Sequence, residues 1–375
     1  MKFLHTADWQ LGIKAAHVGG AGVRVREERL ASLNRVAEAA QNHSVDFILI
    51  AGDIFEDNGV ERTLVQKAVD ILSNFKIPVY LIPGNHDPLI PGSVWEHPSW
   101  ESTDKITILR REEPVSIPGG ILYPCPVREK YSRKDPTEWI QASDAEGIQI
   151  GVAHGTVEGI QQEEPDYPIP RDAAIRAGLD YLALGHWHST ATYPAPDGAV
   201  RMAYSGTHEA TKFGERDSGN VLIVDIPSPG TPPKITPVHT GTLSWHTIDE
   251  DIRESGDLLR IRSQIESIEN PASTLVELRI DGLLFAEDRG EIDRINEILS
   301  SRFLFGHLDA SGVRPSPEDE KWVSNLPPGI LRNAATRLRE LADPHFAGER
   351  PQRASPEVAS RALLELYALI TEVSP

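Results

Sequence analysis

The chain has 375 residues, enough for two or three domains, and its 39% apolar and 25% charged residues are ordinary for a globular protein. No apolar run approaches the roughly 18 residues that a membrane-spanning helix needs, which excludes a membrane protein. The net charge of −19 argues against nucleic-acid binding over the whole surface, but a local basic patch or a partner could supply such contacts.

The single cysteine, Cys125, excludes an internal disulfide and fits a reducing compartment. The chain passes directly from Met1-Lys2 into a strand pattern, without the features of a signal peptide. We therefore expect a cytoplasmic protein in which Cys125 is a packing residue.

The part from Met1 to about Ile226 alternates between strand and helix patterns. Apolar residues recur at helical spacing over 30–40 and over 64–75, each time between two apolar strand patterns. This β-α-β-α-β order predicts a layered α/β core. Strands are predicted at residues 1–5, 45–50, 77–82, 147–152, 179–184 and 221–226, the last being the final strand of the core, with a Pro/Gly-rich boundary at 228–233.

Two loops in this part have residue types that suit contact with nucleic acid. Residues 88–103 contain Trp95 and Trp100, which suit stacking on bases or a surface loop held in place by its own tryptophans. The densest basic cluster, at 128–134, includes Tyr131 and suits phosphate contact with stacking, with a plain solvated loop as the alternative. Its cationic residues are Arg128, Lys130, Arg133 and Lys134.

The C-terminal part contains two further regions. Patterns between Thr242 and Ala310 predict a second β-α-β-α-β unit, which has no cluster of ligand residues and so no assigned chemistry. Helices are then predicted after Pro327-Pro328 and after Ser355-Pro356, the second with an N-terminal cap. This helix pair either docks a partner or packs on its own domain. The predicted domains are 1–240, 241–315 and 316–375.

Five predicted strands end in metal-ligand residue types, and sites in α/β proteins gather at such strand ends. Carboxylate, amide and imidazole groups together suit Mn²⁺, Fe²⁺ or Zn²⁺ and exclude a thiolate site. The ligands outnumber those that one ion needs, so we expect a two-metal site suited to phosphate ester hydrolysis. Its candidate ligands are Asp8, Asp53, Asn85, His154, His186 and His188.

The order of these motifs resembles that of the calcineurin-like metallophosphoesterases. More narrowly, residues 5–12, 51–55, 84–87 and 184–188 resemble SbcD-type DNA repair nucleases. The resemblance implies an α/β fold: a layered metallophosphoesterase β-sandwich flanked by helices, with a small α+β capping domain and a helical C-terminal tail. The motifs span residues 5 to 188, and the C-terminal regions match that family in layout only.

The resemblance also implies roles for the site residues. Asp53 would bridge two divalent ions, with Mn²⁺ expected and Mg²⁺, Fe²⁺ or Zn²⁺ as alternatives. His86 would face the scissile phosphate as general acid or charge stabiliser, and Asp87 would orient its imidazole or cap the loop. His208 would touch substrate. Asp8, residue 10 and His188 would complete the first metal site, and Asn85, His154 and His186 the second.

Residue 10 departs from the family pattern. The family motif is Asp-x-His, whereas this chain has Asp8-Trp9-Gln10. A glutamine carbonyl is a poorer ligand than imidazole for transition metals. We therefore expect a weaker first site, with reduced activity or a changed metal preference, rather than loss of all activity.

The resemblance implies a DNA exonuclease or endonuclease of break repair that acts with an SbcC-like coiled-coil ATPase. Its helical tail would dock that partner, and the protein would lie at the nucleoid when bound to DNA. A homodimer through the nuclease core is a further expectation. Two alternatives stay open: a phosphodiesterase or phosphatase acting on nucleotides or other phosphoesters, and a nuclease-like scaffold weakened at Gln10.

Overall fold

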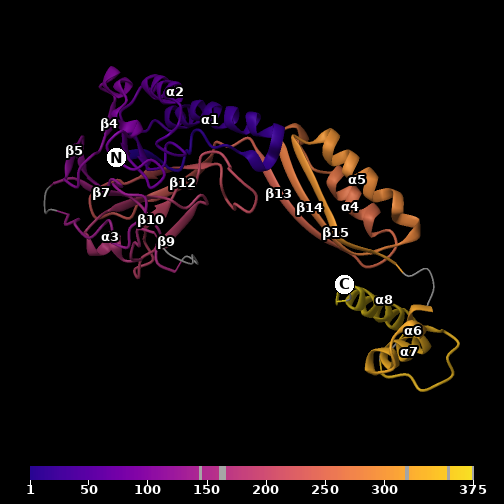
Figure 1. The fold of residues 1–375 in the computed structure, drawn as a ribbon. Coiled ribbons are helices and arrows are strands. Elements are labelled where there is room, and N and C mark those ends of the chain that lie inside the picture. Colours follow the sequence, from indigo (N-terminus) through magenta and orange to yellow (C-terminus); the bar gives the residue numbers. More distant parts are fainter. Residues whose placement is uncertain (143–145, 160–165, 317–320, 353–354, 374–375) are drawn as a thin grey trace. The chain divides into compact units, whose positions relative to one another are not determined.

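A computed structural model describes residues 1–142, 146–159, 166–316, 321–352 and 355–373. The chain divides into two compact units, Met1–Ser244 and Trp245–Pro375, each described here by itself. The first unit runs from indigo to rose in Figure 1, and the second is orange to yellow. The three-part division expected from the sequence stays a prediction.

One sheet of the first unit contains the N-terminal β-α-β-α-β run (Figure 1). Its strand order is β12-β11-β1-β2-β3-β4, with β1 to β4 parallel and β11 and β12 antiparallel. Helices α1 and α2 pack through Leu33, Val36 and Leu72 on one face of this sheet. The elements are β1 (Lys2–Thr6), α1 (Gly22–Asn42), β2 (Phe47–Ala51), α2 (Arg62–Ser73), β3 (Val79–Ile82), β4 (Ile106–Ile108), β11 (Asn220–Asp225) and β12 (Lys234–His239).

The second sheet of this unit has the order β5-β6-β7-β8-β10-β9. Its four central strands are parallel, and β5 and β9 pair antiparallel at the two edges. The short helix α3 packs on its outer face through Ala173 and Ala174. The elements are β5 (Val115–Ile117), β6 (Gly120–Pro124), β7 (Ile148–His154), α3 (Ala173–Arg176), β8 (Tyr181–Gly185), β9 (Ala191–Pro194) and β10 (Val200–Tyr204).

The two sheets bury a shared core that includes Phe3, Leu49, Ile150, Tyr181 and Val224. Each large apolar side chain buried in this way contributes about 1.5–3 kcal/mol relative to exposure. Strands covered on both faces are apolar throughout rather than alternating. This explains the continuous runs of the central strands and confirms the predicted layered α/β sandwich.

The prediction that residues 221–226 form the last strand of the core is wrong. The Pro/Gly-rich run 228–233 is the turn between β11 and β12, which pair in register from Asn220 opposite His239 to Asp225 opposite Lys234. The run therefore reverses the chain within the first unit instead of ending it.

The loop at 88–103 is held in place by its own tryptophans. Trp95 and Trp100 are buried, lie 5.4 Å apart between ring centroids and pack on Phe55. Their indole N–H groups donate to the carbonyls of Asp87 and Val94. Of the two alternatives, the loop held in place by its own tryptophans is therefore correct, because buried rings cannot stack on bases. The loop contains the 3₁₀ turns Val94–Glu96 and Pro98–Ser102, and another 3₁₀ turn spans Ala16–Ala21.

The second unit contains the predicted second β-α-β-α-β run. Its three-stranded sheet has the order β13-β14-β15, and β14 and β15 are parallel. Helices α4 and α5 pack on it through Ile261, Ile265 and Ile295. The elements are β13 (Ser244–Ile252), α4 (Asp257–Glu266), β14 (Thr274–Leu284), α5 (Arg289–Arg302) and β15 (Phe305–Pro315), with 3₁₀ turns at Pro271–Ser273 and Ala286–Asp288.

The C-terminal helices α6 (Lys321–Asn325), α7 (Ile330–Ala342) and α8 (Pro356–Val373) pack on one another. Val323, Ala335 and Leu363 form a small core, and the Trp322 and Tyr367 rings lie 5.0 Å apart. Ser355 Oγ accepts from Val358 N at 3.3 Å, as expected for a cap. The inner faces of these helices therefore pack on one another, and docking of a partner stays a prediction. Outside that core, Ile330, Leu331, Val358 and Leu369 remain exposed.

Among the described residues, no helix has the length and apolar content to cross a membrane.

Candidate metal centre

The candidate ligands come from the carboxyl ends of strands in both sheets of the first unit. The loop after β1 lies beside the loop after β2, because Asp8 N donates to Gly52 O at 3.1 Å and Gln10 N to Asp53 O at 2.9 Å. The carboxylate of Asp8 accepts from His186 N at 3.0 Å, which joins the ends of β1 and β8. The sandwich therefore brings residues 178 positions apart to one place.

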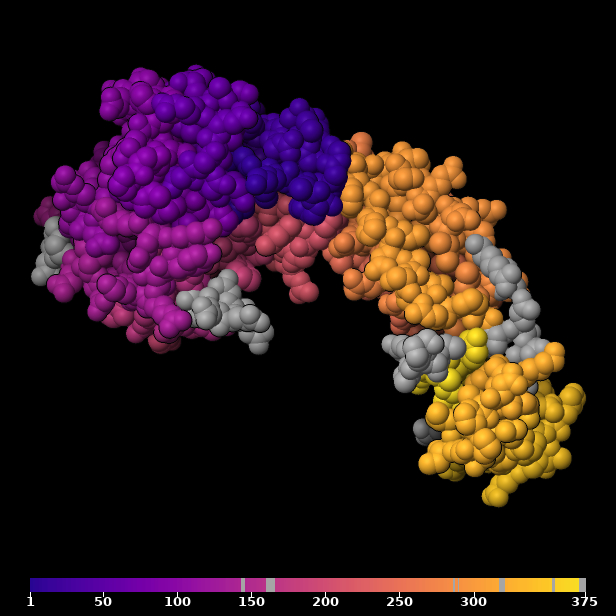
Figure 2. Space-filling view, in the orientation of Figure 1, coloured from indigo at the N-terminus to yellow at the C-terminus, as the bar shows by residue number. Residues whose placement is uncertain are grey.

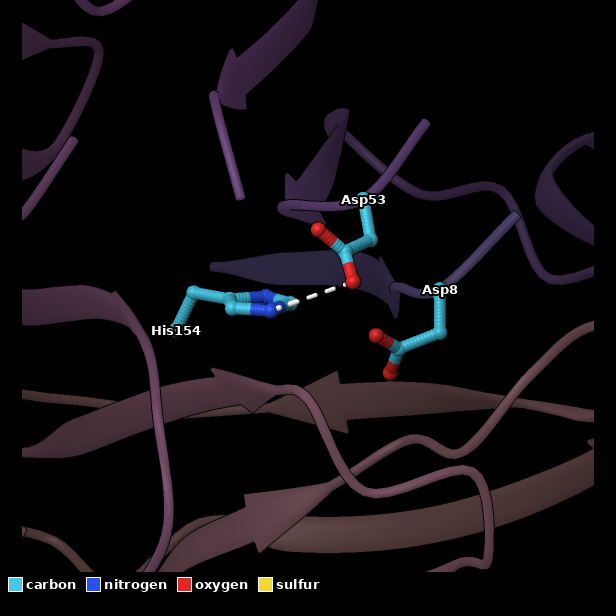
Figure 3. A group of neighbouring side chains, drawn as sticks. All are labelled: Asp8, Asp53 and His154. Atoms are coloured by element: carbon cyan, nitrogen blue, oxygen red, sulfur yellow. Dashed lines mark ion pairs between the residues drawn. The ribbon is translucent and has the colours of Figure 1, made fainter. Parts of the chain in front are cut away.

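Asp8, Asp53 and His154 form the centre of this site (Figure 3). Each offers one ligand atom, and the three atoms lie within 4.8 Å of one another. All three residues are buried. In Figure 3 the Asp53 carboxylate points at the His154 imidazole, and the two atoms joined by the dashed line are 3.3 Å apart. Two carboxylates and one imidazole at this spacing fit a divalent ion with mixed O/N ligands.

The His154 imidazole has its Nε2 atom directed into the site. Its Nδ1 lies 2.9 Å from Ala51 O and donates to it, so Nε2 faces Asp53 Oδ2 and Asn85 Oδ1, the latter at 2.8 Å. Burial opposes the charged ring, but Asp53 and Asp8 outweigh burial and raise the pKa of His154 to about 9. The acceptors that favour a proton at Nε2 would equally favour a divalent cation.

The two carboxylates differ in their ionisation. Burial opposes ionisation of Asp53, but the charge and hydrogen bond of His154 outweigh it, so the pKa of Asp53 lies well below its usual range. Burial raises the pKa of Asp8 to about 6, although His154 and His188 partly offset this. Asp53, which also accepts from His86 N at 2.9 Å, is therefore the more strongly ionised of the two candidate oxygen ligands.

Asn85 lies between two of the candidate histidines. Its Oδ1 is 2.8 Å from His154 Nε2 and 3.3 Å from His186 Nδ1. Its Nδ2 donates to Asp166 Oδ2 at 3.4 Å. Because a carboxylate only accepts, Asp166 favours the amide orientation that keeps Oδ1 toward the site. The sequence contains no local pattern that singles out Asp166, which lies 81 residues from Asn85.

His188 is held by a carboxylate that the sequence analysis missed. Its Nδ1 lies 2.7 Å from Glu215 Oε1 and 3.2 Å from Thr211 Oγ1. A histidine that donates one ring N–H to a carboxylate is oriented with its other nitrogen available as a ligand. Glu215 follows no strand pattern and lies 27 residues away, so only the fold identifies it.

Gln10 lies in the loop that presents Asp8. It is buried, with 4% exposure, and its backbone amide holds the Asp53 carbonyl. Residue 10 is therefore near the site, as the motif predicts, but with a neutral amide instead of an imidazole.

His86 and Asp87 do not have the relationship that the resemblance implies. The two Asp87 oxygens accept from Phe55 N at 2.9 Å and from Gly84 N at 2.7 Å. The His86 ring is held instead by Glu56 O, 2.9 Å from Nδ1. Asp87 is therefore a loop cap, the second of its two predicted roles. Burial, then the nearby Asp53, raise its pKa to about 7.

The prediction that His208 touches substrate is wrong. His208 is fully buried, its Nε2 donates to Arg29 O at 3.0 Å, and its ring packs on Trp9. Burial holds its pKa well below the usual value, so it is a neutral core histidine.

The basic cluster lies partly around a cavity of about 520 Å³. Arg128 and Lys134 line this cavity, but Arg128 donates to Arg110 O at 2.5 Å. Lys130 stacks over the exposed Tyr131 ring at 5.7 Å. Four carboxylates share the cavity wall: Glu112, Glu129, Asp135 and Glu138. Phosphate contact by Arg128, Lys130, Arg133 and Lys134 stays a prediction.

Comparison with known proteins points to one family. The sequence profile described as calcineurin-like phosphoesterase matches residues 1–190. The chain is 26% identical over 280 residues to YhaO of Bacillus subtilis strain 168, an uncharacterized metallophosphoesterase, covering 71% of this chain and 67% of that protein. A solved structure of Vps29 from Entamoeba histolytica, complexed with zinc, matches with a TM-score of 0.30 and 14% identity over 64% of this chain and 99% of that chain.

Proposed function

We propose, because the chain belongs to the calcineurin-like phosphoesterase family, that it hydrolyses phosphodiester bonds in DNA with two divalent metal ions. One observation supports this above the others: buried oxygen and nitrogen ligands converge from strand ends of two sheets, with Asp8, Asp53 and His154 within 4.8 Å. When bound, such ions activate water and neutralise charge on the phosphate.

The side chains around the centre have distinct proposed roles. Asp53 lies close to one member of each ligand group, Asp8 and His154, and would be shared by both ions. His86 is the partly exposed member of its loop, and Glu56 O holds its Nδ1. In its imidazolium form the ring would also carry a proton on Nε2, and this proton could pass to the leaving oxygen of a substrate, which leaves a neutral ring. The two ligand groups are Asp8, Gln10 and His188, and Asn85, His154 and His186.

A DNA substrate and an ATPase partner are proposed from the regions outside the site. Among the described residues, the second unit contains a three-stranded sheet with helices α4 and α5, and the packed helices α6, α7 and α8. The exposed residues Ile330, Leu331, Val358 and Leu369 suit docking of an SbcC-like coiled-coil ATPase. Such a partner would also help to bring a chain of net charge −19 to DNA.

The second candidate function is hydrolysis of a smaller phosphoester. It is favoured by the four carboxylates that share a cavity with Arg128 and Lys134, since they oppose binding of a phosphate backbone there. The site residues handle the phosphate in either case.

The first test is cleavage of end-labelled single- and double-stranded DNA in Mn²⁺ and in Mg²⁺. His86→Ala should lower the rate by about 10²–10⁴-fold, the usual size of a proton-transfer contribution, while Mn²⁺ binding is kept. Gln10→His should raise both metal affinity and rate, because imidazole is the better ligand.

The outcomes separate the alternatives. Hydrolysis of bis-p-nitrophenyl phosphate without cleavage of DNA would favour the smaller substrate. DNA cleavage by Gln10→His alone would indicate a scaffold weakened at residue 10. An unchanged rate in His86→Ala would contradict its role.

A further inference from the structure

Arg29 lies on the inner face of α1 and is almost completely buried, with 1% exposure. Its guanidinium donates to three main-chain carbonyls and one hydroxyl. Nε reaches Trp9 O at 3.1 Å, and Nη1 reaches Glu209 O at 2.6 Å. Nη2 reaches Asp8 O at 3.1 Å and Thr207 Oγ1 at 3.2 Å.

A buried guanidinium is usually paired with a carboxylate, since burial of a charge is costly. The hydrogen-bond acceptors of Arg29 in the described structure are neutral instead. Burial lowers the pKa of Arg29 to about 10, and the nearby carboxylates of Glu215, Glu209, Glu56 and Asp8 limit that fall. The group therefore stays charged at neutral pH, and its geometry suits holding main-chain carbonyls in fixed positions.

The carbonyls that Arg29 holds belong to two segments on which candidate ligands depend. One segment includes Asp8 and leads to Gln10. The other includes Thr207, which forms a parallel bridge with Ala7 and donates its N–H to His188 O at 3.0 Å. One guanidinium thus joins the backbones that support Asp8, Gln10 and His188.

We infer that Arg29 is a positioning residue for the ion proposed to lie among Asp8, Gln10 and His188. This inference rests on the proposed two-ion centre. The hydrogen bonds of Arg29 in the described part of the chain reach none of Asn85, His154 and His186, the ligands of the second proposed ion. Loss of the guanidinium hydrogen bonds should therefore weaken the binding of one ion much more than the binding of the other.

Arg35 provides a matched control on the same helix. Its Nε donates to Thr240 O at 2.6 Å, and its Nη2 donates to Glu209 Oε2 at 3.0 Å. Arg35 thus also connects α1 to the segment around residue 209, but these contacts do not reach the loop of Asp8 and Gln10. A general loss of helix packing should appear in the variants of both arginines. Weaker binding of one ion should appear only in the Arg29 variants.

The experiment titrates Mn²⁺ into metal-free full-length protein and counts bound ions by calorimetry and by electron paramagnetic resonance of free Mn²⁺. Wild type, Arg29→Gln, Arg29→Lys and Arg35→Gln are compared, each also in the Gln10→His background that strengthens the same ion. Thermal unfolding of every variant separates loss of stability from loss of metal. Arg29→Lys keeps the charge but loses the planar fork, and it remains informative where Arg29→Gln does not fold.

Arg29→Gln should lower the affinity for one Mn²⁺ ion by about 10–100-fold, the usual effect of removing a group that supports a metal ligand. The affinity for the other ion should be unchanged. Arg29→Lys should fall between Arg29→Gln and wild type, and Arg35→Gln should bind both ions normally. Two normally bound ions in both Arg29 variants, or equal loss in Arg35→Gln, would overturn this inference alone. Failure of the wild type and of Gln10→His to bind two ions would overturn the two-ion function as well.

Discussion

At the scale of single residues, the candidate site is built on unusual backbone geometry. Asp8, Gln10, Asp53 and His186 all have positive φ angles, between 38° and 105°. Such conformations cost about 1–3 kcal/mol each for residues other than glycine and persist where surrounding contacts hold them. Here the contacts are the backbone hydrogen bonds between the loops after β1 and β2. The positive φ angles turn the chain sharply at the strand ends, next to the ligand side chains.

His5, on the strand β1 that precedes Asp8, should make stability depend on pH. Tyr181 Oη donates to its Nδ1 at 2.9 Å, its Nε2 donates to Leu184 O at 3.1 Å, and burial lowers its pKa from 6.5 to about 3. The unfolded chain therefore binds a proton below pH 6.5 that the folded chain does not. The contribution of neutral His5 to the free energy of unfolding is complete above pH 6.5. It falls by about 1.4 kcal/mol per pH unit as pH decreases from 6.5 toward 3.

The measurement is urea unfolding of metal-free protein between pH 8 and pH 5. His5→Gln should have a shallower pH dependence than wild type, whereas His43→Gln, at an exposed position after α1, should match wild type. Identical slopes for wild type and His5→Gln would show that His5 does not titrate in this way.

At the scale of elements, the site depends on how closely strand-end loops approach one another. A Cβ atom on Gly84 would lie 2.1 Å from Asp53 Oδ1 and 2.4 Å from Asp53 N. A Cβ atom on Gly185 would lie 1.9 Å from Ala51 O. The glycines of the Gly-Asn-His-Asp and Gly-His-x-His motifs are thus required by packing between loops. The ligands that follow them come together because nothing larger separates the loops.

Gly84→Ala should displace Asp53 and lower Mn²⁺ affinity by at least about tenfold, because the added methyl group occupies the place of its carboxylate. Gly20→Ala is the control, since a Cβ atom there meets nothing within 4 Å. Calorimetric titration with Mn²⁺, with thermal unfolding alongside, makes the comparison. Normal affinity in Gly84→Ala would mean that Asp53 moves freely or does not bind metal.

At the scale of the whole molecule, chemistry and proposed partner docking belong to different units. Every candidate ligand lies within Met1–Ser244, whose two sheets and flanking helices have their own cores. The second unit has separate cores and the exposed apolar residues of α7 and α8. The orange and yellow surface in Figure 2 belongs to this unit. The two properties should therefore be separable by substitution.

Substitution of both Ile330 and Leu331 by Glu should abolish capture of an SbcC-like ATPase and leave hydrolysis of bis-p-nitrophenyl phosphate unchanged. The two apolar side chains that the partner would cover would be replaced by charged side chains, whose removal from water is costly. Asn333→Glu with Ala334→Glu is the matched control, because these exposed residues of the same helix gain the same charge. A pull-down with the purified ATPase measures the effect, and capture by the Ile330 and Leu331 variant would contradict the docking site.

The sequence by itself indicated six strands of the first unit and the candidate ligands that follow five of them. This was possible because strands buried on both faces are continuously apolar, and because Asp53, Asn85 and His186 each follow such a run directly. The tertiary structure alone decided which side chains support those ligands: Glu215 at His188, Asp166 at Asn85 and Arg29 behind Asp8. It also decided that His208 is buried and that Asp87 caps its loop. These contacts join residues far apart in the chain or depend on which face of a loop is covered, and neither property leaves a local pattern.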